Sequence, residues 1–166
     1  QFDLAHMLVE EMKELGLKDV RVDDKCYVYG YSPATEGYED RKAIGLIAHL
    51  DTAPAAPGEN VHPQIVENYN GEDITLLNGT VISVSKFPHL KELKGRTLIT
   101  TDGNTLLGAD DKAGIAEILT ACERILNENI PHGKICVGFT PDEEVGRGAA
   151  HFDVKNFGAD FAYTID

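Results

Sequence analysis

The sequence predicts an α/β fold built around a sheet of parallel strands. Apolar, strand-like segments alternate with segments of helical periodicity, which is the pattern of parallel strands joined by helices. Ala43–Leu50 is apolar on both faces, as expected of a central strand that helices cover on each side. Lys134–Phe139 is a second apolar strand, and Pro141 ends it because proline cannot donate to a strand ladder. A length of 166 residues suits one domain, or part of a larger one.

The first 50 residues contain one expected helix and three expected strands. Apolar residues at helical spacing predict a helix over Phe2–Leu15, and Gly16 ends it. Short strands are expected at Val20–Val22 and Cys26–Tyr31, before the central strand.

The middle of the chain predicts loops and short strands. Thr52–His62 is rich in alanine, proline and glycine, which indicates a loop. Val61–Ser85 has short β-like pieces that the turn signals Asn70-Gly71 and Asn78-Gly79 interrupt. Arg96–Thr101 is expected to be a further strand.

The last third begins with the strongest helix signal of the sequence. Asp110–Asn129 has one broad apolar face, and its first residues are acidic, where they favour the positive end of a helix. After the strand Lys134–Phe139, a short helix is expected over Ala149–Lys155. A last strand over Ala159–Ile165 ends at Asp166.

Composition excludes several classes of partner. The chain has 28 acidic and 15 Lys or Arg residues, a net charge of −13, which disfavours nucleic acid and anionic membranes and permits a cation-binding centre. Its three cysteines are Cys26, Cys122 and Cys136, with no C-x-x-C pair, so neither a disulfide framework nor a thiolate zinc site is expected. The cytoplasm is the simplest compartment. The sequence has no apolar run long enough to span a membrane or serve as a signal peptide.

Three short polar stretches follow predicted strands. Asp142, Glu143 and Glu144 lie at the carboxyl end of the strand Lys134–Phe139, where open α/β sheets place their sites. These carboxylates repel one another unless cations or protons intervene. A solvated acidic turn is the alternative interpretation of this stretch.

His49 and Asp51 end the central strand, and their spacing of two directs both side chains to one face. A metal-binding imidazole needs an acceptor for its other N–H, and a carboxylate is a common one. A structural ion pair is the alternative. Asp110-Asp111-Lys112 precedes the strong helix, where ordinary helix capping would explain one aspartate but not two.

Three of these side chains, together with Asp166 at the end of the last predicted strand, form a candidate metal-binding set. His49, Asp110, Glu144 and Asp166 supply one nitrogen and three carboxylates, each at or just beyond the end of a predicted strand. A mixed set of this kind suits two divalent ions that share a ligand.

At this level of detail the sequence resembles the dinuclear-zinc exopeptidases, a family that includes carboxypeptidase G, aminoacylase and succinyl-diaminopimelate desuccinylase. The H-x-D, A-D-D-K and D-E-E motifs are typical of the family. The motif TLLGADDKAG and the segment 60–74 are typical of its tripeptidase branch. The matching stretches are AHLDT (48–52), NVHPQIVENYNGEDI (60–74), TLITTDGNTLLGADDKAGIAEI (97–118), IPHGKICVGFTPDEEVGRGAAHFDV (130–154) and AYTID (162–166).

The resemblance implies two zinc ions. His49 and Asp166 would hold one ion, Glu144 would hold the other, and Asp110 would bridge them. The peptide bond between Asp110 and Asp111 is expected to be cis. Glu143 would be the general base, and Asp51 would orient the ring of His49.

The resemblance also implies a fold and an activity. The fold is a three-layer α/β one with a mixed, mainly parallel sheet and helices on both faces. The activity is zinc-dependent removal of the N-terminal residue from tripeptides. Alternatives are a related dipeptidase or N-acyl amino acid amidohydrolase, or a non-catalytic cation-binding homologue.

Residues 1–166 are expected to be the N-terminal part of the catalytic domain. The rest of that domain, with a further histidine ligand, and a lid domain that could form a homodimer would lie outside them. The chain by itself is therefore expected to be inactive.

Overall fold

The computed structural model describes residues 1–166, which form two compact units. One unit contains Gln1–Ala53 and Ala109–Asp166, and the other is the intervening segment Pro54–Gly108. The sequence patterns did not predict this division. No helix of the chain is long and apolar enough to cross a membrane.

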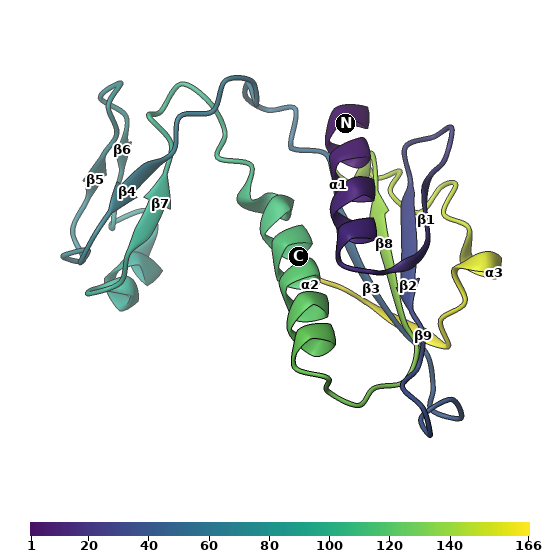
Figure 1. The fold of residues 1–166 in the computed structure, drawn as a ribbon. Coiled ribbons are helices and arrows are strands. Elements are labelled where there is room, and N and C mark those ends of the chain that lie inside the picture. The colour runs from purple at the N-terminus through teal and green to yellow at the C-terminus, as the bar shows by residue number, and fades with distance from the viewer. The chain divides into compact units, whose positions relative to one another are not determined.

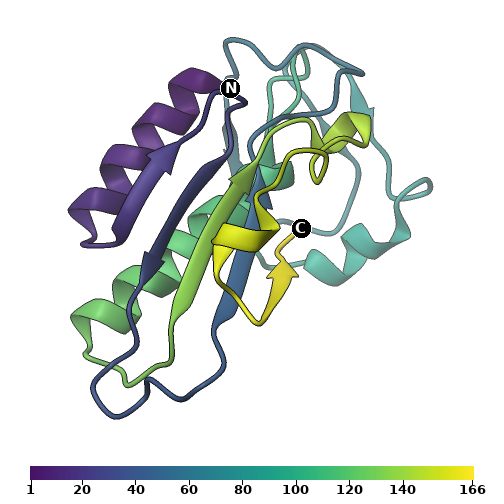
Figure 2. The same ribbon diagram turned by 90° about the vertical axis from the view of Figure 1, so that its right-hand side faces the viewer.

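The first unit is built on a five-stranded mixed sheet (Figure 2). In spatial order its strands are β1 (Lys18–Val22), β2 (Val28–Ser32), β8 (Ile135–Thr140), β3 (Ile44–His49) and β9 (Phe161–Thr164). Strand β3 is parallel to both β8 and β9, whereas β1–β2 and β2–β8 are antiparallel. The predicted α/β class and the interior position of the Ala43–Leu50 strand are confirmed.

Helices lie on both faces of this sheet, as predicted (Figure 1). α1 (Phe2–Glu14) and α2 (Ala109–Asn127) cover one face, and the short α3 (Val154–Phe157) lies on the other. The first face carries the main core, because alternate residues of β8 point into it and pack against both helices. Its fully buried members include Met12, Val28, Ile118, Val137 and Phe139.

The second face of the sheet packs against aromatic side chains. Phe152 and Phe157 meet edge to face, with ring centroids 4.9 Å apart, and Tyr29 joins them from β2. Gly45 of β3 makes this approach possible, because a Cβ atom there would lie 2.5 Å from the Phe157 ring.

The short helix on this face is displaced from its expected position at Ala149–Lys155. It begins after Asp153, whose carboxylate accepts the N–H of Asn156, and it ends at Gly158 with a φ of 76°. The main-chain N–H of Asp153 donates to the hydroxyl of Tyr29, which holds this start against the sheet.

The second unit consists of two small antiparallel sheets and a 3₁₀ helix. The sheets pair β4 (Gln64–Val66) with β7 (Leu98–Thr100) and β5 (Ile74–Thr75) with β6 (Val81–Ile82), and the 3₁₀ helix is Pro88–Leu93. Their small core consists of Tyr69, Ile74, Val84 and Leu90. The short strands predicted here are confirmed.

Candidate metal centre

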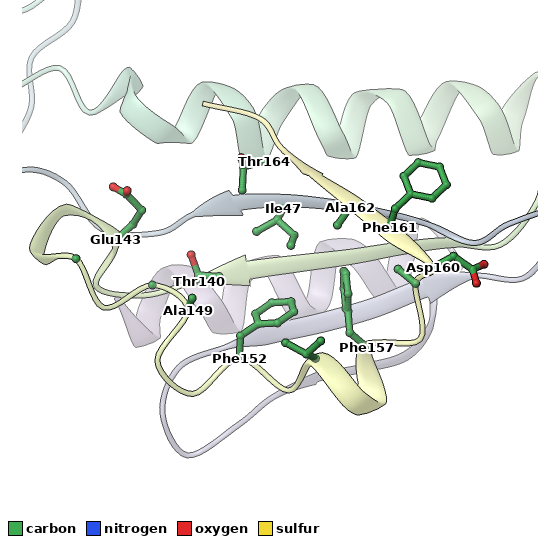
Figure 3. A pocket seen from close by; sticks show the side chains of 14 residues that line it. Ile47, Thr140, Glu143, Ala149, Phe152, Phe157, Asp160, Phe161, Ala162 and Thr164 are labelled. Carbon is green, nitrogen blue, oxygen red and sulfur yellow. The ribbon is translucent and has the colours of Figure 1, made fainter.

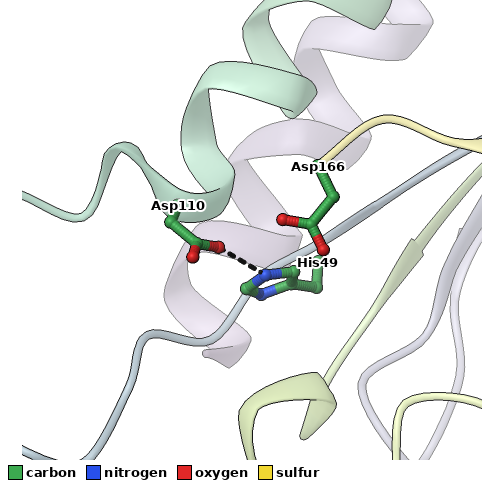
Figure 4. Close-up of side chains that lie close together, drawn as sticks. All are labelled: His49, Asp110 and Asp166. Atoms are coloured by element: carbon green, nitrogen blue, oxygen red, sulfur yellow. Dashed lines mark hydrogen bonds and ion pairs between the residues drawn. The ribbon is translucent and has the colours of Figure 1, made fainter. Parts of the chain in front are cut away.

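Three predicted ligands meet at the carboxyl edge of the sheet in the first unit. His49 ends β3, Asp166 follows β9, and Asp110 precedes the regular part of α2 (Figure 4). One potential ligand atom from each lies within 4.8 Å of the others. His49 and Asp166 lie side by side because β3 and β9 are parallel neighbours, with Ile47 opposite Thr164.

His49 is held so that one ring nitrogen faces the carboxylates. The side chain is only 3% exposed, and its Nδ1 lies 3.0 Å from the main-chain carbonyl of Asp51. An Nδ1–H that donates to this carbonyl leaves Nε2 as the metal-binding atom. Nε2 lies 2.9 Å from Oδ1 of Asp110.

The electrostatics of this cluster favour a cation. Burial lowers the pKa of His49, but the hydrogen bond with Asp110 and the charges of Asp51, Asp111 and Glu143 act in the opposite direction, and the net effect raises this pKa. A divalent ion would therefore compete with a proton for the imidazole.

The donor set fits a divalent metal ion. One imidazole nitrogen and carboxylate oxygens are a common set for zinc. Ligand atoms around a tetrahedral zinc ion lie roughly 3.3 Å apart when each bond is about 2.0–2.1 Å. The 2.9 Å between His49 and Asp110 and the 4.8 Å limit for the whole group are compatible with one such ion.

Asp51 links this cluster to the acidic turn after β8. Its carboxylate accepts the main-chain N–H groups of Glu143 and Glu144, each at 3.0 Å, and its side chain is 10% exposed. It is also 3.4 Å from Nδ1 of His49. The sequence indicated a contact with the ring but not the two bonds to the turn.

The two glutamates of this turn have different positions. Glu143 is half-exposed, and its Oε2 lies 3.6 Å from Nε2 of His49. Glu144 is half-buried and is not among the three residues whose ligand atoms gather. The structure thus brings together three of the four predicted metal ligands, with the predicted base beside them.

Asp110 and Asp111 are joined by a cis peptide bond, as the resemblance implied. Both have non-helical backbone angles, so the regular helix begins after them. Asp110 is 68% exposed in its side chain and turns toward His49. Asp111 is buried, and its Oδ1 accepts the N–H of Gly114. Helix capping therefore explains Asp111, while Asp110 is left for other chemistry.

Burial also shifts the pKa values of the residues that follow Asp110. It raises the pKa of Asp111, against the effect of hydrogen bonds from the N–H groups of His49 and Gly114. Burial lowers the pKa of Lys112, which the neighbouring acids partly offset. Nζ of Lys112 donates to the carbonyl of Leu50 at 3.1 Å.

An apolar cavity of about 630 Å³ lies on the second face of the sheet (Figure 3). Ile47, Phe152, Phe157 and Ala162 line it, and Glu143 lies at one end. No sequence pattern predicted this cavity, because it forms only where residues between Thr140 and Thr164 fold back beside Ile47 of β3.

Comparison with known proteins finds similar peptidases. Residues 98–165 match peptidase family M20/M25/M40. The whole chain is 58% identical over 167 residues to peptidase T of Clostridium perfringens, of which it spans 41%. The chain thus resembles peptidase T along its whole length, and its residues 98–165 resemble peptidase family M20/M25/M40.

Two solved structures resemble the chain in fold. An aminopeptidase PepT from Bacillus cereus has a TM-score of 0.71 and 28% identity, and the match covers 97% of this chain and 36% of that one. A tripeptidase from Staphylococcus aureus has a TM-score of 0.69 and 29% identity, and the match covers 96% and 36%. The resemblance to the tripeptidase branch is confirmed, although the chain spans less than half the length of these relatives.

The raised pKa of His49 predicts a pH-dependent contribution to the stability of the metal-free protein. A raised folded-state pKa stabilises the fold below the unfolded value and loses this contribution as pH rises through the folded value. We expect the wild type to have a higher denaturant midpoint than His49→Gln, and this difference should be larger at about pH 6 than at about pH 8. Urea unfolding with a chelator present measures this, and a difference that does not change with pH would contradict it.

The bonds of Asp51 predict that its carboxylate supports metal binding. Asp51→Asn leaves one oxygen for two N–H donors and loosens the turn beside His49. We expect zinc affinity, measured by calorimetry, to fall by about 10–100-fold.

Asp142→Asn is the control, since it makes the same change within the turn that Asp51 holds, where Oδ1 of Asp142 accepts a hydrogen bond only from the side chain of Gln1. Asparagine also tolerates the left-handed backbone of Asp142, whose φ is 57°. Equal zinc affinities for the two variants would refute a supporting role for Asp51.

Proposed function

We propose that this chain carries zinc-binding and general-base residues of an aminopeptidase that removes the N-terminal residue from tripeptides. The observation that carries the proposal is the group of His49, Asp110 and Asp166, with the carboxylate of Glu143 3.6 Å from the imidazole. The similarity to peptidase T and to a solved tripeptidase supports the substrate class.

His49, Asp110 and Asp166 would hold one ion. Asp110 is proposed to bridge to a second ion, which Glu144 would ligate together with a histidine outside these 166 residues. When bound, zinc supplies a Lewis acid that polarises the substrate carbonyl and lowers the pKa of water. Asp51 would hold the ring of His49 through its main-chain carbonyl and the turn of Glu143 and Glu144 through its carboxylate, and so fix their relative positions.

Glu143 is the residue proposed to move the proton. Its carboxylate takes a proton from the attacking water as the water oxygen bonds to the carbonyl carbon of the peptide. It then gives this proton to the amide nitrogen as the carbon–nitrogen bond breaks, which releases the amine. Half exposure leaves the carboxylate accessible to a substrate. No side-chain nucleophile is needed.

The chain spans 41% of the C. perfringens relative, so this activity is proposed for a complete peptidase. Residues 1–166 would form the N-terminal part of its catalytic domain, and substrate length and any homodimer would depend on a lid outside them. The chain by itself is expected to be inactive and to bind zinc weakly or at one site. A cytoplasmic location accords with its three buried free thiols.

The exchange of Glu143 for glutamine tests the proposed base. In the complete peptidase, Glu143→Gln should lower turnover of a tripeptide by about 10²–10⁴-fold, because proton transfer is lost. Its zinc content, measured by elemental analysis, should stay close to that of the wild type.

Glu144→Gln is the matched variant one residue further along and should lose zinc together with activity. If Glu143→Gln loses zinc while Glu144→Gln keeps it, the two roles have been assigned the wrong way round.

A further inference from the structure

The proposed chemistry leaves one buried carboxylate of the first unit without a role. Asp111 is 3% exposed and is the only acidic residue among the buried side chains. Its Oδ2 accepts the main-chain N–H of His49 at 3.1 Å, and its Oδ1 accepts that of Gly114 at 3.0 Å. One carboxylate therefore joins the end of β3 to the first turn of α2.

Gly114 brings a third segment to the same place. A Cβ atom at this position would lie 2.3 Å from Oδ1 of Asp111 and 2.5 Å from the carbonyl oxygen of Ile165. Only a residue without a side chain lets the end of β9 pack this closely on the helix. The N–H of Ile165 donates to the carbonyl of Ile47, which fixes this strand end to β3.

Each candidate ligand is thus a direct neighbour of the pair Asp111 and Gly114. His49 donates its own N–H to Asp111, Asp110 precedes Asp111 in the chain, and Asp166 follows Ile165. The three ligand-bearing segments come from different parts of the sequence, and this pair contacts all of them.

We propose that Asp111, packed against Gly114, is a positioning residue that sets the spacing of His49, Asp110 and Asp166 and so the affinity of this group for a divalent ion. The proposal rests on the proposed function in taking the three residues as metal ligands. Ligands held at fixed positions before an ion arrives bind it more tightly than ligands that must first be ordered.

The geometry requires a carboxylate in particular. Two buried N–H donors need two acceptor oxygens, and both oxygens of Asp111 are used. Asparagine offers one acceptor oxygen, and its NH₂ group would face a main-chain N–H, so that two donors would meet without an acceptor. Asp111→Asn therefore releases either the His49 end or the Gly114 end while leaving the side-chain volume almost unchanged.

Zinc binding by the 166-residue chain tests the proposal. We expect Asp111→Asn to weaken zinc affinity by about 10–100-fold, measured by competition with a chromophoric chelator. The visible spectrum of bound cobalt(II) should change as well, because the spacing of its ligands changes.

Asp23→Asn is the control for loss of a carboxylate charge, since Asp23 accepts two main-chain N–H groups, from Lys25 and Tyr27, both at Oδ1, which asparagine keeps. It should leave zinc affinity and the cobalt spectrum unchanged. A purely structural role for Asp111 would make the two variants alike in both metal readouts.

Gly114→Ala keeps the carboxylate but displaces Asp111 or Ile165, so it should weaken zinc binding as well. If Asp111→Asn does not fold, Gly114→Ala tests the positioning role in its place. Wild-type affinity in a folded Asp111→Asn, or in a folded Gly114→Ala if the first variant does not fold, would overturn the positioning role alone. If His49→Gln binds zinc as the wild type does, both this inference and the proposed function fail.

Discussion

The parallel pairing of β3 with both of its neighbours is the constraint on which the site depends. Because β8, β3 and β9 run in one direction, the chain segments that follow them emerge at one edge of the sheet. That edge receives Asp51, Glu143 and Asp166 from three separate parts of the sequence. The fourth segment, at the start of α2, is added by the contacts of Asp111 and Gly114 with the strand ends.

The acidic residues at this edge divide into two kinds. Asp51 and Asp111 are largely buried, and each accepts two main-chain N–H groups, which satisfies the carboxylate and fixes the backbone. Asp110, Glu143 and Asp166 keep exposed carboxylates around His49. The buried carboxylates hold the backbone of the site in place, and the exposed carboxylates are available to a cation and a substrate. Charges of one sign at this density favour a cation among them.

Much of this arrangement could be predicted from the sequence. Apolar runs and helical periodicity located the strands of the main sheet and both long helices, because these patterns report burial directly. The three gathered ligands could be named from their positions at strand ends and from the family motifs. The cis bond between Asp110 and Asp111 came from the resemblance alone.

The remaining features depend on contacts between distant residues. The bond from the N–H of His49 to Asp111 spans 62 positions, and no local pattern encodes it. The spacing of Asp111 and Gly114 was a usable signal, since an aspartate three residues before a helical glycine suggests a cap beside a close approach. The short helix was predicted at Ala149–Lys155 but lies at Val154–Phe157, because its start depends on the capping carboxylate of Asp153 and the hydroxyl of Tyr29.

The central claim is that His49, with Asp110 and Asp166, binds a divalent ion. X-ray absorption at the zinc edge, on the chain with one equivalent of zinc, tests it most directly. We predict one imidazole nitrogen and carboxylate oxygens at about 2.0–2.1 Å, with the imidazole signal absent in His49→Gln. The same spectrum from the wild type and His49→Gln would contradict the account.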